Sequence, residues 1–265
     1  MPLRKHRQAL DELYEAYNRR RYVHPDPVEF LYAYDDSEDR EVAALVASSL
    51  AFGRVAHILV SVRKVLDRLG PSPASFLADT PDARLRSMFA GFVHRFVGSD
   101  ELAAMLIGAK RARRRFGGLQ ACFRQGVGSN DGTVVPALTA FSAALNELGG
   151  GCGFLLPSPA GGSACKRLNL MLRWLVRRDD VDPGGWPTEW ADKLLVPLDT
   201  HMHRIARAMN ATRRKAADLR TAEEVTAAFR GIRPDDPVRY DFALTRLGIH
   251  PDLKGAEFPA VCGPA

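Results

Sequence analysis

The sequence has only four cysteines among 265 residues, and they stand far apart, at positions 122, 152, 165 and 262. Structural zinc sites and iron–sulfur clusters use closely spaced cysteines, so this spacing predicts neither. Four dispersed cysteines also make no disulfide framework, which favours a reducing, cytoplasmic environment. We therefore expect a protein without a bound metal or other cofactor.

Long apolar runs are also missing. The N-terminus, MPLRKHRQALDELYEAY, contains no apolar segment of signal-peptide length. Residues 42–62 are rich in apolar side chains, but a glycine and polar residues interrupt them, namely Ser48, Ser49, Gly53, Arg54 and His57. This pattern predicts a pair of buried helices rather than a membrane span, so we expect no membrane partner.

No segment shows the alternation of apolar and polar residues that is typical of a β-strand. Apolar side chains instead recur at helical spacing along the whole chain. We expect helices at 4–20, 38–52, 54–69, 134–147, 164–178, 200–209 and 236–248 among about ten or more. The sequence therefore predicts an all-α protein.

The charge balance favours an anionic partner. The formal net charge is +6 and the isoelectric point is about 9.3. Five of the six residues from Lys110 to Arg115 are basic. This cluster has two interpretations, a solvated helix C-terminus or a surface that contacts phosphates.

The segment from Leu156 to Ser163 contains prolines and glycines that prevent a helix, and Ser163 is a good N-cap for the helix expected at 164–178. Lys166 then falls in the first turn, where the helix dipole and nearby arginines are expected to lower the pKa of its amine. Such a lysine is a candidate nucleophile for Schiff-base chemistry. The alternative is a solvated basic face, because a polar stripe on this helix contains Lys166, Asn169, Arg173 and Arg177.

Asp199 stands directly before the next long helix, as an N-cap does. Hydrogen bonds from the first backbone amides of that helix are expected to lower the pKa of its carboxyl. An isolated Asp199 would be interpreted as a helix cap only. A carboxylate placed 33 residues after a lysine in a glycine-rich turn, however, favours a shared site.

The two elements together resemble the helix-hairpin-helix/Gly-Pro-Asp superfamily of DNA glycosylases, which includes endonuclease III and the 8-oxoguanine glycosylases. The family hairpin, Leu-Pro-x-x-Gly followed by a nucleophilic lysine, resembles Leu156-Pro157, Gly161-Gly162 and Lys166. The family motif (Val/Leu)-Asp-Thr-His resembles Leu198-Asp199-Thr200-His201, with Arg204 one turn later. The chain also resembles uncharacterised bacterial proteins that carry the segments CKRLNL, PLDTH and RYDFAL.

The sequence departs from the family pattern in its turn, and from endonuclease III in the spacing of its motifs and in its cysteines. Ser-Pro-Ala stands between Pro157 and Gly161, so the turn is longer than the usual one. The spacing between Lys166 and Asp199 is longer than in endonuclease III and similar to that of the archaeal 8-oxoguanine glycosylases. The dispersed cysteines leave no place for the iron–sulfur loop of endonuclease III.

The resemblance implies one glycosylase-like unit over residues 1–265. Its two helical lobes would comprise about 40–180, including the hairpin, and 1–39 with 190–265. Lys166 and Asp199 would be catalytic and would face each other across a cleft. The residues that would contact DNA are Gly161, Gly162, Ser163, Arg167, Arg173, His201, Arg204 and Arg54.

The resemblance also implies a function. We expect a monomeric base-excision glycosylase, bifunctional with lyase activity, whose partner is double-stranded DNA with a damaged base, an oxidised purine. The alternative is a helix-hairpin-helix protein that binds nucleic acid without catalysis.

Overall fold

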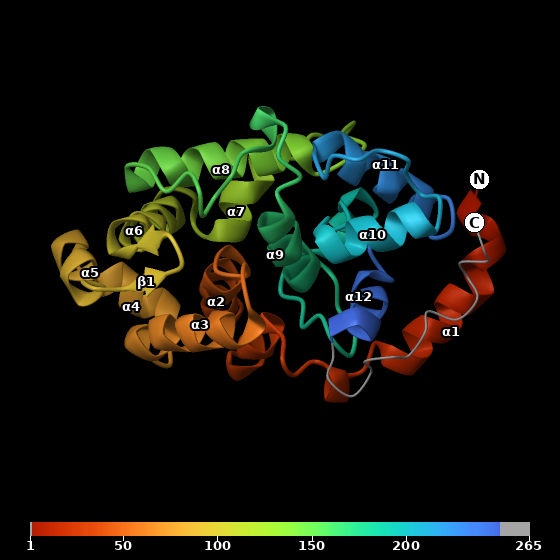
Figure 1. The fold of residues 1–265 in the computed structure, drawn as a ribbon. Coiled ribbons are helices and arrows are strands. Elements are labelled where there is room, and N and C mark those ends of the chain that lie inside the picture. Colours follow the sequence, from red (N-terminus) through yellow and green to blue (C-terminus); the bar gives the residue numbers. More distant parts are fainter. Residues whose placement is uncertain (1, 250–265) are drawn as a thin grey trace. The chain divides into compact units, whose positions relative to one another are not determined.

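A computed structural model describes residues 2–249, and Cys262 lies outside this range. The expected all-α fold is confirmed, because helices dominate the described residues (Figure 1). The one sheet within this range is a two-stranded antiparallel hairpin, in which Val93 pairs with Gly98 and His94 with Val97. Its strands contain two residues each, which is too short for sequence alternation to reveal.

Contacts within the chain divide it into two compact units, residues 26–161 and residues 1–25 with 162–265. The first contains η3 Pro27–Ala33, α2 Ser37–Ser49, α3 Val55–Leu69, α4 Pro73–Asp79, α5 Asp82–Met88, β1 Val93–His94, β2 Val97–Gly98, α6 Ser99–Phe116, α7 Leu119–Arg124, α8 Val135–Gly149 and η4 Pro159–Gly161. The second contains η1 Pro2–His6, α1 Arg7–Tyr17, η2 Arg20–Tyr22, α9 Lys166–Val176, η5 Thr188–Lys193, α10 Thr200–Ala208, α11 Leu219–Arg230 and α12 Asp241–Ile249.

These boundaries differ from the expected ones near residues 40 and 180. Helix α9, which follows the hairpin, belongs to the same unit as α10. The physical reason is that Arg173 and Arg177 of α9 form buried ion pairs with carboxylates of that unit. Lys166 and Asp199 therefore lie within one unit, instead of belonging to two lobes.

In the unit of residues 26–161, helix α2 is buried along most of its length. Its acidic side chains hydrogen-bond to the N-termini of neighbouring helices. Asp39 accepts from the backbone N–H of Ala74 in α4 at 2.8 Å, and Glu41 accepts from Leu119 and Gln120 in α7 at 2.9 and 3.0 Å. Because these N–H groups have no partner within their own helices, the carboxylates both satisfy them and favourably meet the positive helix ends.

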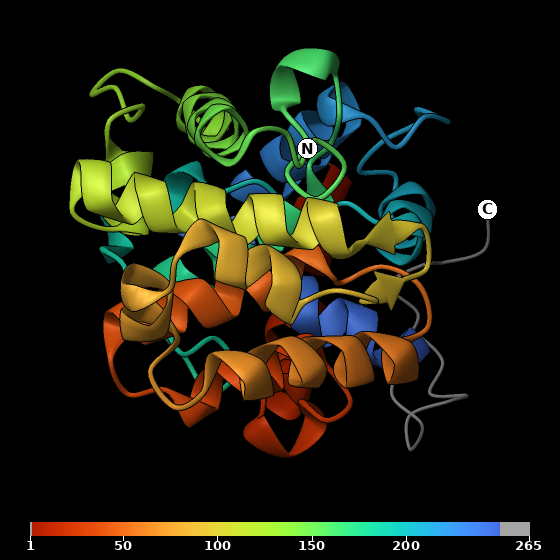
Figure 2. The same cartoon turned by 90° about the vertical axis from the view of Figure 1, so that its left-hand side faces the viewer.

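Helices α6 and α8 pack closely in the same unit (Figure 2 shows this unit from the side). A Cβ atom placed on Gly108 would lie 2.3 Å from the carbonyl oxygen of Leu145. One placed on Gly149 would lie 2.2 Å from that of Ala104. Glycine at both positions therefore lets the two backbones approach each other, which no larger residue permits.

Gly108→Ala is expected to lower the free energy of unfolding by about 2 kcal/mol or more, because the added methyl group overlaps backbone atoms that cannot rotate away. Urea denaturation measures this loss. The matched control is Gly132→Ala, since a Cβ at Gly132 meets no heavy atom within 4 Å. Equal stabilities of the two variants would contradict this account of the packing.

The other unit has its core around α9, with Trp174, Leu175, Phe229 and Tyr240 all buried. Helix α12 packs against both α1 and α10. The N-terminal helix is shorter than expected, because the residues on either side of α1 form 3₁₀ turns. Among residues 2–249, no helix combines the length and the apolar character that crossing a membrane requires.

Candidate functional site

The turn before α9 places Lys166 as the first residue of that helix. Gly162 has φ +79°, its carbonyl accepts a hydrogen bond from Leu219 N at 2.9 Å, and Ser163 forms a β-bridge with Asp218. The helix begins two residues later than expected, so Ser163 is not its N-cap. Its hydroxyl instead accepts from Cys165 N at 3.1 Å within the turn.

Cys165 occupies the N-cap position in a left-handed conformation, with φ +45°. This region is unfavourable for a residue with a Cβ, and such strain is concentrated at functional sites. Burial raises the pKa of the Cys165 thiol, although Ser163 and the nearby Arg167 oppose the shift. A buried thiol whose pKa is raised is a poor nucleophile, so Cys165 is not a candidate nucleophile.

Asp199 is the N-cap of α10, as expected. One carboxylate oxygen, Oδ1, accepts a hydrogen bond from Met202 N at 2.8 Å, and the Asp199 carbonyl accepts from His203 N. The helix fixes the direction of the carboxylate, because the cap bond occupies one of its two oxygens.

The second carboxylate oxygen of Asp199 lies 3.9 Å from Nζ of Lys166. Both side chains are 27 % exposed, so they are partly shielded but accessible to a ligand. Two turns far apart in the sequence thus bring an amine and a carboxylate together at the beginnings of α9 and α10. At this distance both groups can act on one reacting carbon.

The rest of the polar stripe on α9 is buried, which corrects one expectation. Asn169, Arg173 and Arg177 are only 1 %, 3 % and 5 % exposed. Arg173 is expected to contact DNA, but its guanidinium is held inside the unit by Asp182, at 3.1 Å, and by Asp241. It therefore cannot reach a phosphate, and we withdraw it from the DNA-contacting residues.

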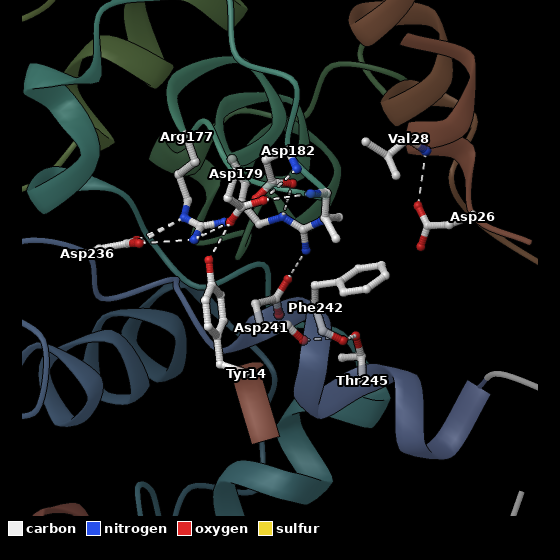
Figure 3. A network of polar contacts seen from close by, with 12 residues as sticks. Tyr14, Asp26, Val28, Arg177, Asp179, Asp182, Asp236, Asp241, Phe242 and Thr245 are labelled. Carbon is white, nitrogen blue, oxygen red and sulfur yellow. Dashed lines mark hydrogen bonds and ion pairs between the residues drawn. The ribbon is translucent and has the colours of Figure 1, made fainter. Parts of the chain in front are cut away.

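Arg177 lies at the centre of a buried ionic cluster (Figure 3). Arg173 joins the same cluster through Asp182. Arg177 pairs with Asp236 at 3.0 Å, with Asp179 at 2.9 Å and with Asp182. The hydroxyl of Tyr14 donates to Asp179 at 3.0 Å and so joins α1 to the cluster. The cluster fixes the orientation of α9 and therefore the position of Lys166.

The cluster contains more carboxylates than guanidiniums, and the pKa values of Asp182 and Asp179 are shifted in opposite directions. Burial, helped by the charge of Asp179, raises the pKa of Asp182 to about 6, against the influence of Arg173 and Arg177. The pKa of Asp179 is lowered: its burial acts upward, but the charge of Arg177 and backbone hydrogen bonds outweigh it. As the pH rises, the ionisation of Asp182 therefore lowers the free energy of unfolding, whereas that of Asp179 raises it.

Between pH about 4 and 6, the folded protein keeps the Asp182 proton that the unfolded chain has already released. The free energy of unfolding from this group therefore falls as the pH rises, by up to about 1.4 kcal/mol per pH unit. Asp182→Asn should make this decline shallower. The part that remains comes from Asp241, because burial raises the pKa of that carboxyl too. Urea denaturation of the wild type and of Asp182→Asn at pH 4 to 7 measures this decline. The same decline in the two proteins would contradict a raised pKa of Asp182.

The other expected DNA-contacting residues have different surroundings. Gly162 and Arg204 are exposed, and Ser163 and His201 are half-buried, all in the unit of the Lys166–Asp199 pair, whereas the exposed Gly161 is the last residue of the other unit. Arg167 is half-buried, and desolvation lowers its pKa to about 10, so it remains cationic at neutral pH. Arg54 is exposed but belongs to the other unit, directly before α3.

Sequence reasoning missed Asp241, a buried carboxyl that pairs with Arg173 of α9. It is the first residue of α12 and is 4 % exposed. The charges of both Asp199 and Lys166 act on its carboxyl. A signal was present, because Asp241 lies in RYDFAL, one of the three segments singled out together, and Lys166 and Asp199 lie in the other two.

Metal binding has no support in the described part of the chain. No group of three or more His, Cys, Asp or Glu side chains there could hold an ion. The ring of His203 is instead within hydrogen-bond distance of the carbonyl of Arg214, at 3.0 Å from Nε2.

Comparison with known proteins identifies the family but no activity. No curated protein and no solved structure matches the chain. Residues 26–250 match the model of a family described as "protein of unknown function (DUF2400)". This match spans most of the chain and includes α9, α10 and α12. The chain therefore belongs to the DUF2400 family.

Proposed function

We propose that the protein is a DNA base-excision glycosylase with lyase activity that removes an oxidised purine. The observation that carries this proposal is the 3.9 Å separation between Nζ of Lys166 and Oδ2 of Asp199, at the first turns of two helices. The resemblance of both motifs to those of the helix-hairpin-helix glycosylases supplies the substrate class. The basic charge of the chain supports a polyanionic partner.

In the proposed reaction the damaged nucleotide is rotated out of the duplex, so that its sugar reaches the pair. The Asp199 carboxylate stabilises the positive charge that develops on the sugar as the bond to the base breaks. The neutral amine of Lys166 attacks C1′, the electron pair of the broken bond leaves with the base, and the base takes up a proton. The sugar ring then opens to an imine on Lys166.

The imine accounts for the lyase step. It acidifies C2′ of the opened sugar, so loss of a C2′ proton expels the 3′-phosphate and cleaves the strand. Water then releases the sugar fragment and regenerates the amine.

Surfaces near the pair suit the phosphate backbone. The exposed backbone at Gly162 and the exposed Arg204 lie in the same unit as the pair, and the exposed Gly161 directly precedes Gly162 in the sequence. Exposed backbone amides and arginine side chains are both common phosphate ligands. We propose these groups, with His201, Ser163 and Arg167, as the contacts that hold the strand.

A non-catalytic nucleic-acid-binding protein is the second candidate. It is favoured by the ion pair itself, since a Lys166–Asp199 contact could serve only to join α9 to α10. This alternative predicts DNA binding that weakens steeply with salt and no excision of any base.

A panel of duplexes separates the two candidates. Each duplex contains a single damaged base, and each damaged base is tested opposite each of the four normal bases in turn. The glycosylase proposal predicts release of at least one oxidised purine and cleavage of the strand at that position. Binding to the whole panel without release of any base would favour the second candidate.

A further inference from the structure

Helix α10 and the chain that leads from it to α11 carry four exposed arginines. Arg204 and Arg207 lie three residues apart on one face of α10, Arg213 lies in the connecting segment, and Arg220 lies in the first turn of α11. Within residues 2–249, none of these four guanidiniums forms an ion pair or a hydrogen bond with another side chain. The fold therefore leaves their charges open to a ligand.

The fold uses the one carboxylate of this stretch for other purposes. Asp218 is the only acidic residue between positions 200 and 220. Its Oδ1 accepts a hydrogen bond from Thr221 N at 2.9 Å, as the N-cap of α11, and its Oδ2 accepts from Nη2 of Arg214 at 2.8 Å. Asp218 thus neutralises Arg214, and no acidic side chain of this stretch is left for the four exposed arginines.

The connecting segment is held against α10, the helix that Asp199 caps. Nε2 of His203 on α10 lies 3.0 Å from the carbonyl oxygen of Arg214. Within the segment, Thr212 Oγ1 accepts a hydrogen bond from Arg214 N at 3.1 Å. Arg213 stands between these two residues, so its backbone is fixed although its side chain is exposed.

The far end of the segment is held against the turn before α9. Asp218 forms a β-bridge with Ser163, and Leu219 N donates to the carbonyl of Gly162 at 2.9 Å. Ser163 precedes Lys166 by three residues. The arginines therefore stand on backbone that is attached both to α10 and to the start of α9, the two elements that supply the candidate catalytic pair.

Arg220 occupies a position that does not favour a cation for the sake of the helix alone. It is the second residue of α11, and the first turn of a helix carries a partial positive charge. A phosphate beside Arg220 would be attracted by both the guanidinium and the helix end. It would also remove the repulsion between them.

The surface suits a nucleic-acid backbone better than a membrane. Proteins that bind membrane surfaces combine cations with exposed apolar side chains that enter the bilayer. Among the described residues, the large exposed apolar side chains all belong to the other unit, namely Val60, Val93, Phe96 and Phe154. Guanidiniums, in contrast, bind the oxygens of a phosphate through paired hydrogen bonds.

We propose that Arg207, Arg213 and Arg220 extend the surface to which Arg204 belongs, and that they bind the phosphates that flank the nucleotide held at Lys166. Each guanidinium replaces the counterions of a phosphate, so these contacts hold the strand without reading its sequence. The position of these phosphates beside the attacked nucleotide rests on the proposed function, whereas the binding of DNA by the arginines does not.

The salt dependence of DNA binding tests the proposal. The wild type and the triple variant Arg207→Gln, Arg213→Gln, Arg220→Gln are titrated onto a fluorescein-labelled, undamaged duplex between about 50 and 200 mM salt. The slope of log K against log salt should become shallower by about two to three in the triple variant, because each lost phosphate contact removes about 0.9. Its dissociation constant at the lowest salt should rise about tenfold or more.

The matched control removes the same charge from the other unit. Arg84, Arg86 and Arg124 are exposed, and their side chains form no ion pair or hydrogen bond within residues 2–249. The triple variant Arg84→Gln, Arg86→Gln, Arg124→Gln should keep the slope of the wild type. Equal changes in the two triple variants would mean that net charge alone attracts DNA, and would overturn the proposal.

The remaining outcomes separate the surface from the proposed function. If the wild type releases no base from the panel while the slope changes only in the Arg207 triple variant, the glycosylase function falls and the surface stands. If the wild type excises a base but both triple variants bind like it, the surface falls and the function stands. Binding of the wild type to phosphatidylserine vesicles but to no duplex would also overturn the surface.

Discussion

Lys166→Gln is expected to abolish the covalent adduct that borohydride forms between the protein and DNA carrying an abasic site. The adduct requires a primary amine that becomes an imine with the opened sugar, and glutamine has none. Its side chain is nevertheless polar and of similar length, so the start of α9 and its partly exposed position should be preserved. The adduct, measured as a band of reduced mobility on a denaturing gel, should fall by at least 10³-fold, the usual scale for a lost nucleophile.

The matched control is Lys215→Gln, which removes an exposed lysine from the same unit. It should trap DNA as the wild type does. An undiminished adduct in Lys166→Gln would mean that another amine attacks the sugar, and the proposed role of Lys166 would then be wrong.

Asp199→Asn is expected to separate helix capping from catalysis. Asparagine caps a helix nearly as well as aspartate, so its Oδ1 can still accept from Met202 N and the stability should change little. The negative charge beside Lys166 is lost, however, and with it the stabilisation of the developing sugar cation. Base excision under single-turnover conditions should slow by about 10²–10³-fold or more while DNA binding is retained.

Two further variants complete this test. Asp199→Ala should lose excision and also about 0.5–2 kcal/mol of stability, because the cap is removed. Asp36→Asn is the matched control, since Asp36 caps α2 in the other unit in the same way and lies in no proposed site. A stable Asp199→Asn protein with full excision activity would show that Asp199 is a cap only.

The signals that could be interpreted from the sequence are local ones. Neighbouring residues alone indicate that an aspartate before a helical pattern is a cap. They also indicate that a lysine soon after a glycine-rich turn lies in the first turn of a helix. The cap of α10 and the place of Lys166 at the beginning of α9 could therefore be predicted. The predicted start of α9 is two residues too early, because the Ser163 hydroxyl accepts a hydrogen bond within the turn and Cys165 takes a left-handed conformation. Such turn geometry has no clear sequence signal for a residue other than glycine.

The burial of Arg173 could not be predicted for a different reason. Helical spacing places Arg173 on the same stripe as Lys166, but only tertiary structure brings Asp182 and Asp241 to it. A basic residue on a helix is usually solvated, and the pairing that buries this one involves a residue 68 positions away. Because of the same long separation, the sequence does not show that Asp241 lies against α9, the helix that carries Lys166.

The most direct measurement of the central claim is the identity of the residue that reacts with DNA. Wild-type protein is trapped with borohydride on a duplex carrying an abasic site, digested, and mapped by tandem mass spectrometry. The account predicts the sugar adduct on Nζ of Lys166, the amine that lies 3.9 Å from Asp199. An adduct on another lysine or on the N-terminal amine, with Lys166 unmodified, would contradict it.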